Sequence, residues 1–376
     1  MIKNESLYLA GPLVFYVNGG EMWQAWRREA LYHGFKVALP NDNVPEAEPG
    51  NKRQLSASIF KNCRDSINQT TTIIANLETY RGMVPDGGTV FEVGMAYGKG
   101  AKCYGYTKDK RPEGQKYGLA KLDKEGIWDL DGRKLPNYQL PFGPCLVGSS
   151  KIIEGTFSDA LAVFKADLEE ASKLKANRNV EVKVKAAERT LFAKDKPLVY
   201  LSTFERYDID AQLKLTAMKE ILSRYGFEGI SPLEDAPGVE RVESDDLYEV
   251  AYNTFDHYQQ HVRNCDIILA NLNPYHGYEP NDDVSFECGM AFQLGKKLFA
   301  YVDDLRPMVE LIPNGGEANG CRDVNGMNVE DFENPLNLMF GASFTLFTGA
   351  FEDVVKQMAD ALLDFKLADD LVPPVL

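Results

Sequence analysis

PDGGTVFEVGMAYGKG, residues 85–100, places Glu92 between apolar residues just after a pair of glycines. EPNDDVSFECGMAFQLGKK, residues 279–297, repeats the same frame around Glu287. The two glutamates are 195 residues apart, and Pro85 and Pro280 keep the same offset. A constant offset across several motifs is typical of an internal repeat. We therefore expect the 376-residue chain to contain two similar domains.

Apolar and amphipathic segments alternate on both sides of each copy, and their order predicts the fold. Strands are expected at 6–15, 35–40, 71–77, 197–204, 227–232 and 266–272, and helices at 21–34, 156–175, 210–226 and 350–365. Such alternation predicts an α/β protein with parallel sheets, helices on both faces and a ligand at the carboxyl ends of the strands. The first domain is expected at 1–174, a charged linker poor in large apolar residues at 175–195, and the second domain at 196–376.

The composition excludes several classes of function. A formal net charge of −15 argues against a nucleic acid polymer as a partner, because such binding relies on Lys and Arg. No apolar run is long enough to span a membrane. The start of the chain does not resemble a secretory signal, and six cysteines without a CxxC pair suit a reducing cytoplasm. With four scattered histidines and neither a phosphate loop nor a GxGxxG motif, we expect no metal and no cofactor.

Glu92 has a structural and a catalytic interpretation. Thr89 and Glu92 match a capping box, in which the two side chains satisfy free backbone donors at a helix start. The second copy has Val284 in place of Thr89, and valine cannot cap. A carboxylate on the first turn of a helix is also favoured in its ionised form, which makes it an available nucleophile. Asp86 is close enough in the chain to act as the proton donor of a carboxylate pair, although a turn residue is the plainer interpretation.

Several separated motifs together resemble one protein family. YLAGPLVF beginning at Tyr8, LPNDN containing Asp42, ANLETYRGMVPDGGTVFEVG and the late PFGP resemble the nucleoside 2-deoxyribosyltransferases, above all their protozoan-like branch. The resemblance covers nearly all of the first half. In the second half it is weak at YLSTFER and strong from DIILANL onward. It implies two flavodoxin-like (Rossmann-like) parallel-sheet domains that form an internal pseudo-dimer.

The resemblance also implies roles for individual residues. Glu92 would attack the anomeric carbon of 2-deoxyribose and hold the sugar covalently until a second base arrives. Asp86 would move the proton to and from the base, and Tyr8 would orient Glu92. The implied substrate-binding residues are Gly11, Phe15, Asp42, Asn337 and Met339.

The two halves differ at the positions that complete such a pocket. In the family an Asn and a Met come from the neighbouring subunit, and here Asn337 and Met339 match them. The first half has Gly143 and Cys145 at these positions, unless the late motif is aligned with a shift. The loop of the second half has Asn281 where the first has Asp86. This predicts one intact composite site and a second, degenerate site formed by Glu287, Tyr200 and Asn281.

Three functions fit these residues. The first is a transferase that exchanges the base of 2-deoxyribonucleosides, with nucleosides and free bases as partners. The second is a hydrolase of nucleosides or nucleoside 5′-monophosphates, and the third is an inactive nucleoside-binding protein. Asn337 favours a neutral 5′-hydroxyl and so the transferase. Cys63 and Tyr258 stand where many family members have Asp or Asn, which leaves the preferred base open, as is any assembly beyond the pseudo-dimer.

Overall fold

The fold is described from a computed structural model. It covers residues 5–116, 118, 121–123, 126–130, 132–135, 139–175 and 196–370. Of the expected linker at 175–195, only Lys175 lies within this range, so the domain boundaries remain predictions. No helix in the described ranges is long and apolar enough to cross a membrane.

Each half of the chain forms a five-stranded sheet in which all neighbouring strands are parallel. The first sheet has the order β2 (Lys36–Ala38), β1 (Ser6–Ala10), β3 (Thr72–Asn76), β4 (Lys102–Thr107), β7 (Lys151–Glu154). The second has the order β9 (Glu228–Ile230), β8 (Leu198–Ser202), β10 (Ile267–Asn271), β11 (Lys297–Tyr301), β12 (Thr345–Phe347). The two orders correspond strand for strand, which confirms the predicted α/β fold and its repetition.

Long helices cover both faces of each sheet. The outer layers are formed by α1 (Gly19–Tyr32) and α6 (Phe157–Lys175), and by α7 (Ala211–Arg224) and α12 (Phe351–Asp370). The inner layers are formed by α2 (Lys52–Gln69) and α3 (Gly87–Gly98), and by α8 (Leu247–Asn264) and α9 (Asp282–Gln293). The central strands β3 and β10 are buried along their whole length, as their continuous apolar sequence predicts.

Shorter elements complete the two halves. The short helices are α4 (Glu113–Lys116), α5 (Pro144–Ser149), α10 (Met308–Leu311) and α11 (Leu338–Gly341). A separate antiparallel pair joins β5 (Lys121–Asp123) and β6 (Gly126–Trp128). Single 3₁₀ turns cover Pro12–Phe15, Phe204–Tyr207 and Glu317–Asn319. The expected strand at 6–15 is therefore wrong beyond Ala10, because Pro12 lacks the N–H that a strand would need.

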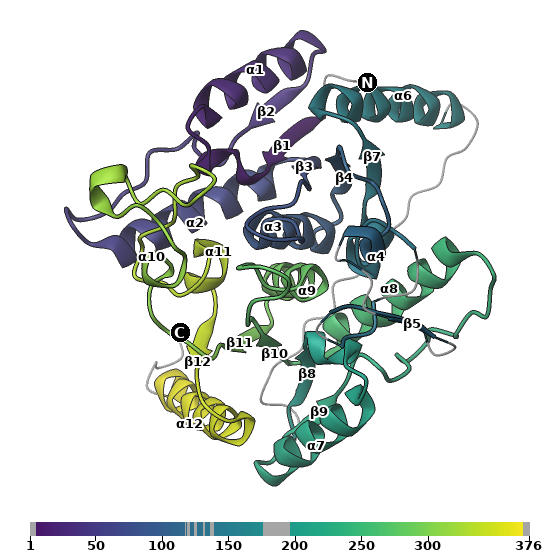
Figure 1. Ribbon diagram of the computed structural model, residues 1–376, viewed down its shortest axis with the longest axis vertical. Helices are drawn as coiled ribbons and strands as arrows, with labels where there is room; N and C mark the ends of the chain where they lie inside the picture. The colour runs from purple at the N-terminus through teal and green to yellow at the C-terminus, as the bar shows by residue number, and fades with distance from the viewer. Residues whose placement is uncertain are drawn as a thin grey trace, which may run out of the picture.

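The two halves meet where α3 and α9 lie side by side at the centre of the molecule (Figure 1). Glycine makes this contact possible. A Cβ atom on Gly94 would lie 2.1 Å from the carbonyl oxygen of Phe286, and one on Gly289 would lie 1.9 Å from that of Phe91. The reciprocal contacts relate the halves by a pseudo-twofold axis. Around it, α5 of the first half packs on α8 and α9, while α11 of the second half packs on α2 and α3.

Candidate active site

The site is built on the first turns of α3, whose N-cap is Asp86. Its Oδ2 atom accepts hydrogen bonds from the backbone N–H of Thr89 at 2.8 Å and from the Thr89 hydroxyl at 2.6 Å. The other carboxylate oxygen, Oδ1, is buried and has no hydrogen-bond partner in the described structure. The capping-box interpretation of Thr89 and Glu92 does not apply, because the helix begins at Gly87 and Glu92 lies on its second turn rather than its first.

Glu92 is buried and is held by one phenol. The hydroxyl of Tyr8, which lies in the middle of β1, donates to Glu92 Oε1 at 2.5 Å. Burial, opposed by the bond from Tyr8 and assisted by the nearby Asp86, raises the pKa of Glu92 to about 8. The expectation that the helix end keeps Glu92 ionised is thus wrong, because desolvation outweighs the helix dipole. Burial also raises the pKa of Tyr8, so the phenol stays a donor.

A cavity of about 540 Å³ opens over Glu92 between the two halves. Among the predicted residues, Gly11, Phe15, Asp86, Glu92, Asn337 and Met339 line it. Tyr8 is not among the described lining residues, but its hydroxyl contacts Glu92. The cavity walls also include Asn41, Asn43, Ile59, Asn62, Cys63, Gly88, Thr89, Asn328, Glu330 and Phe332. Its volume and mixed lining are those of a pocket for a small organic ligand.

Asn337 reaches the cavity from the second half. It is the N-cap of α11, where its Oδ1 atom accepts from the Met339 backbone N–H at 2.9 Å. A Cβ atom on Gly88 would lie 2.5 Å from this Oδ1 atom, so the absence of a side chain at Gly88 admits Asn337 beside α3. Gly143 is the N-cap of α5 in the first half, which confirms the alignment of the two late motifs.

Asp42 lies beside the cavity rather than in its described lining. Its carboxylate forms an ion pair with Arg27 and accepts from the Leu39 backbone N–H at 2.9 Å. These contacts hold the loop that brings Asn41 and Asn43 to the cavity wall. A direct role of Asp42 in binding substrate remains a prediction.

Glu330 is a cavity residue that the sequence analysis missed. Its Oε2 atom accepts from the Leu338 backbone N–H at 2.9 Å, and burial raises its pKa to about 8. Glu330 lies 194 residues after Pro136, so the first half has no carboxylate at the matching position. That difference between the copies was the available signal.

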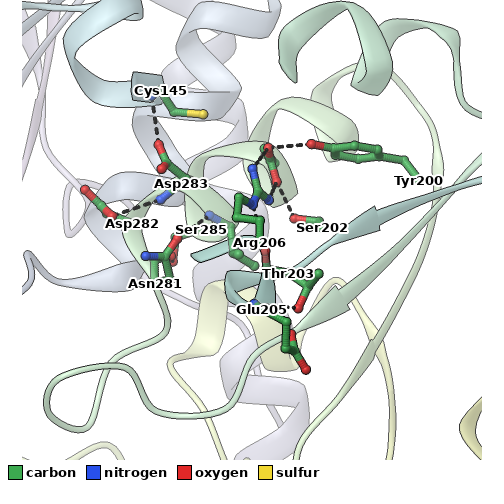
Figure 2. Close-up of polar contacts among 12 residues, drawn as sticks. Cys145, Tyr200, Ser202, Thr203, Glu205, Arg206, Asn281, Asp282, Asp283 and Ser285 are labelled. Atoms are coloured by element: carbon green, nitrogen blue, oxygen red, sulfur yellow. Dashed lines mark hydrogen bonds and ion pairs between the residues drawn. The ribbon is translucent and has the colours of Figure 1, made fainter. Parts of the chain in front are cut away.

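The corresponding site of the second half, here called the mirror site, is formed by Tyr200, Ser202, Arg206 and Glu287. Both oxygens of Glu287 accept from the Arg206 guanidinium, at 2.8 and 2.7 Å. Tyr200 donates to Oε1 at 2.8 Å and Ser202 to Oε2 at 2.5 Å. Figure 2 shows Arg206 and Tyr200 pointing toward the same carboxylate. Glu287 thus keeps the tyrosine contact of a catalytic glutamate, but an internal cation neutralises it.

Arg206 matches Val14, which is part of the wall of the first cavity, so the mirror site has a guanidinium where the first site has a short apolar side chain. Asn281 caps α9 by accepting from the Val284 backbone N–H at 3.2 Å. Asn281 therefore caps its helix as Asp86 does, but it has no carboxyl group that could carry a proton.

Asp283 fills the mirror site from the opposite side. It matches Gly88, and its carboxylate accepts from the Cys145 backbone N–H at 2.8 Å (Figure 2). Asn337 accepts from the Met339 backbone N–H in the same way at the first site. A Cβ atom on Gly143 would lie 2.4 Å from Asp283 Oδ2. At the first site the second half supplies the side chain (Asn337) and α3 supplies the glycine (Gly88). At the mirror site α9 supplies the side chain (Asp283) and the first half supplies the glycine (Gly143).

The profile of one family, described as nucleoside 2-deoxyribosyltransferase, matches residues 7–133 and 199–339. The chain belongs to this family. The two matched regions agree with the tandem repeat, and each contains one of the two glutamates. Family membership makes an enzymatic role the natural context for the Glu92 pocket.

Comparison with solved structures gives a 2-desoxiribosyltransferase from Leishmania mexicana, at 23% identity over 44% of this chain and 97% of that chain, with a TM-score of 0.33. A solute-binding protein of an ABC transporter from Agrobacterium vitis, with bound allitol, matches 99% of this chain and 92% of that chain at 9% identity, with a TM-score of 0.20. No curated protein matches the chain.

The chemistry open to the first site is that of its carboxyls. Within the described residues, no group of three or more His, Cys, Asp and Glu side chains is arranged to hold a metal ion. Glu92 and Asp86 lie at one wall of the cavity, where carboxyl groups can serve as a nucleophile and a proton carrier.

Proposed function

We propose that the protein is a nucleoside 2-deoxyribosyltransferase that exchanges the base of 2-deoxyribonucleosides in the Glu92 cavity. The convergence of Tyr8, Glu92 and Asp86 from the first half with Asn337 from the second carries this proposal. The amide nitrogen of Asn337 is left for the sugar because its oxygen caps α11.

In the first half-reaction, the ionised form of Glu92, which is the minor form near pH 7 because burial raises its pKa, attacks C1′ of the sugar with a carboxylate oxygen. The C1′–N bond breaks, and its electron pair leaves with the base, which takes the proton of Asp86. The product is a deoxyribosyl ester of Glu92. In the second half-reaction, a nitrogen of the incoming base attacks C1′, the ester electron pair returns to Glu92, and Asp86 recovers a proton from that base. Two inversions at C1′ give net retention.

The lining of the cavity supports an uncharged nucleoside as substrate. Asp86, Glu92, Glu330 and Asp331 are acidic, and no Lys or Arg is among the described lining residues. A 5′-monophosphate would meet these carboxyls without the cations that bind phosphate elsewhere. The same lining argues against a nucleotide hydrolase.

Replacement of the nucleophile tests the proposal. Incubation with deoxyinosine and adenine should yield deoxyadenosine, and Glu92→Ala should lower that rate at least about a thousandfold, because the covalent route is removed. With nucleoside alone, intact-mass analysis should detect a deoxyribosyl adduct on the parent protein and none on the variant. Release of free deoxyribose without exchange would favour a hydrolase, and near-normal exchange by Glu92→Ala would contradict the mechanism.

A further inference from the structure

The N-terminus of α3 carries a second carboxyl group, which comes from the other half of the protein. Glu279 precedes α9 in the chain, yet its Oε2 atom accepts from the backbone N–H of Gly87, the residue next to Asp86, at 3.0 Å. Asp86 accepts from the N–H of Thr89 on the same turn. Two carboxyls from different halves therefore cap one helix end.

Neither carboxyl is fully satisfied. Asp86 is 3% exposed and Glu279 is 2% exposed. One oxygen of each, Oδ1 and Oε1, is buried without a hydrogen-bond partner among the described residues, and the Tyr80 hydroxyl nearby is in the same state. An ionised oxygen buried in this way is costly, and two neighbouring carboxylates would also repel each other. This arrangement favours one retained proton.

The nearby cation, Arg81, is paired with another carboxylate. Arg81 forms a buried ion pair with Asp323 at 2.9 Å, and its guanidinium also donates to the carbonyl oxygen of Asn328 at 2.5 Å. The titratable and charged groups around the carboxyl pair include Tyr16, Tyr80, Arg81, Glu92, Asp323 and Glu330. Burial followed by Asp86 raises the pKa of Glu279 to about 8, and burial raises the pKa of Asp86.

Both members of the pair are absent from the mirror site. Asn281 takes the place of Asp86, and Val84 takes the place of Glu279. Val84 is buried against Phe204, Tyr207 and Tyr275. Asp86 and Glu279 are thus both present at the Glu92 cavity, and both are replaced at the mirror site. Such paired replacement points to a shared task.

We propose that Glu279 is a positioning residue that shares one proton with Asp86 across the interface between the halves and so keeps Asp86 protonated for transfer to the departing base. This role rests on the proposed transferase function. Asp86 gives its proton to the base nitrogen as the C1′–N bond breaks, and the carboxyl pair is left with one negative charge more. The incoming base returns that proton when its nitrogen bonds to C1′.

Glu279→Gln tests the shared proton, because Gln keeps an acceptor for the Gly87 N–H but carries no acidic proton. We expect the alkaline fall of kcat/KM for base exchange to move to lower pH by about one unit, the usual scale for losing a neighbouring carboxylate. Exchange at pH 8 should drop about tenfold, with little change at pH 6. A purely structural role would lower the rate by the same factor at both pH values.

Asp282→Asn is the matched control. Asp282 is a buried carboxyl whose Oδ2 atom accepts a backbone N–H, that of Gly143, at 3.1 Å, but it lies at the mirror site. Its substitution should leave the pH profile of exchange unmoved. An unshifted profile for Glu279→Gln, or the same shift for Asp282→Asn, would overturn the proposal.

Infrared titration keeps the proposal independent of turnover. In protein labelled with ¹³C-glutamate, the band of protonated Asp side chains should disappear at lower pH in Glu279→Gln than in the parent, and an identical titration would overturn the shared proton. A parent without exchange activity would refute only the transferase function.

If Glu279→Gln does not fold, Asp86→Asn serves instead, because Asn281 shows that Asn caps the corresponding turn of α9. The Glu bands should then titrate at lower pH than in the parent, and an unchanged titration would again contradict the proposal.

Discussion

At the scale of single residues, one glutamate occupies two different environments. Glu92 accepts one hydrogen bond from a tyrosine and faces a cavity, whereas Glu287 accepts four hydrogen bonds, two of them from Arg206. The sequence around the two residues is nearly the same. The difference is set by Val14 and Arg206, which come from the loop after the first strand of each half.

The ion pair of the mirror site should stabilise the protein without contributing to exchange. Glu287→Ala leaves the Arg206 charge buried and unpaired, so the free energy of unfolding should fall by about 3 to 5 kcal/mol. Adding Arg206→Met should recover part of that loss, because it removes the unpaired charge. Urea unfolding of the parent, both single variants and the double variant measures the coupling.

Exchange activity is the second readout of this cycle. Each variant that folds should exchange bases within a few-fold of the parent, because Glu287 lies outside the Glu92 cavity. Additive losses of stability would contradict a direct interaction between Arg206 and Glu287. A loss of activity comparable to that of Glu92→Ala would show that the mirror site also turns over.

At the scale of secondary structure elements, the contact between α3 and α9 places the site. In each helix the N-cap residue directly follows a proline, and each helix has a glycine where the partner backbone passes. Because the helices approach closely, Gly88 of α3 lies against Asn337, and Asp283 of α9 lies against Gly143. The cavity and its filled counterpart are therefore consequences of one helix pair.

Gly94→Ala should loosen this pair. The new methyl group would meet the Phe286 carbonyl oxygen at 2.1 Å, and backbone cannot move aside as a flexible side chain can. We expect a loss of at least about 2 kcal/mol in the free energy of unfolding, the range for overpacking a tight contact. Gly20→Ala on α1 is the control, because no atom lies within 4 Å of its Cβ position. It should be neutral or slightly stabilising, and equal effects of both substitutions would argue against the close contact.

At the scale of the whole molecule, the pocket needs both halves. Asn337→Asp keeps an oxygen to cap α11 but removes the amide donors. For a substrate with a 5′-hydroxyl, kcat/KM should fall about tenfold, the effect of losing one buried hydrogen bond. A 5′-deoxy analogue should hardly distinguish the variant from the parent. An equal loss for both substrates would place Asn337 away from the 5′ position.

Stability should decrease as the pH rises from 7 to 8. The pKa values of Glu92, Glu279 and Glu330 are about 8 in the folded protein, against an ordinary 4.5, so the folded state holds more protons than the unfolded state in this range. Each of these carboxyls should lower the free energy of unfolding by about 1 kcal/mol over the interval. His257 and His261 have the opposite effect on stability, because burial lowers their pKa values and the unfolded state therefore holds more protons on them. This effect falls below pH 7, where these histidines titrate.

Urea unfolding at pH 7 and pH 8 measures this decrease. Glu330→Gln should flatten the pH dependence, because it removes one of the carboxyls that retain a proton. Constant stability across the interval would contradict the protonated state of these groups.

The sequence by itself determined the repeat, the two parallel sheets and the loop that carries Asp86 and Glu92. These features are local, since strand and helix periodicity and the constant offset between copies are readable along the chain. The difference between Asn337 and Gly143 was also visible, because it is a comparison of aligned positions. The local pattern was wrong about the start of α3: it placed Glu92 on the first turn, whereas Asp86 is the N-cap and Glu92 lies on the second turn.

Only the tertiary structure decided which glutamate faces a cavity and how its proton is held. Arg206 reaches Glu287, Glu279 reaches Gly87 and Asp283 replaces Asn337 through contacts between segments more than 80 residues apart in the chain or from opposite halves. Such contacts depend on the pseudo-twofold packing of α3 and α9, which has no local signature. The raised pKa of Glu92 also follows from burial. Burial depends on how the whole molecule packs and not on the residues next to Glu92 in the sequence.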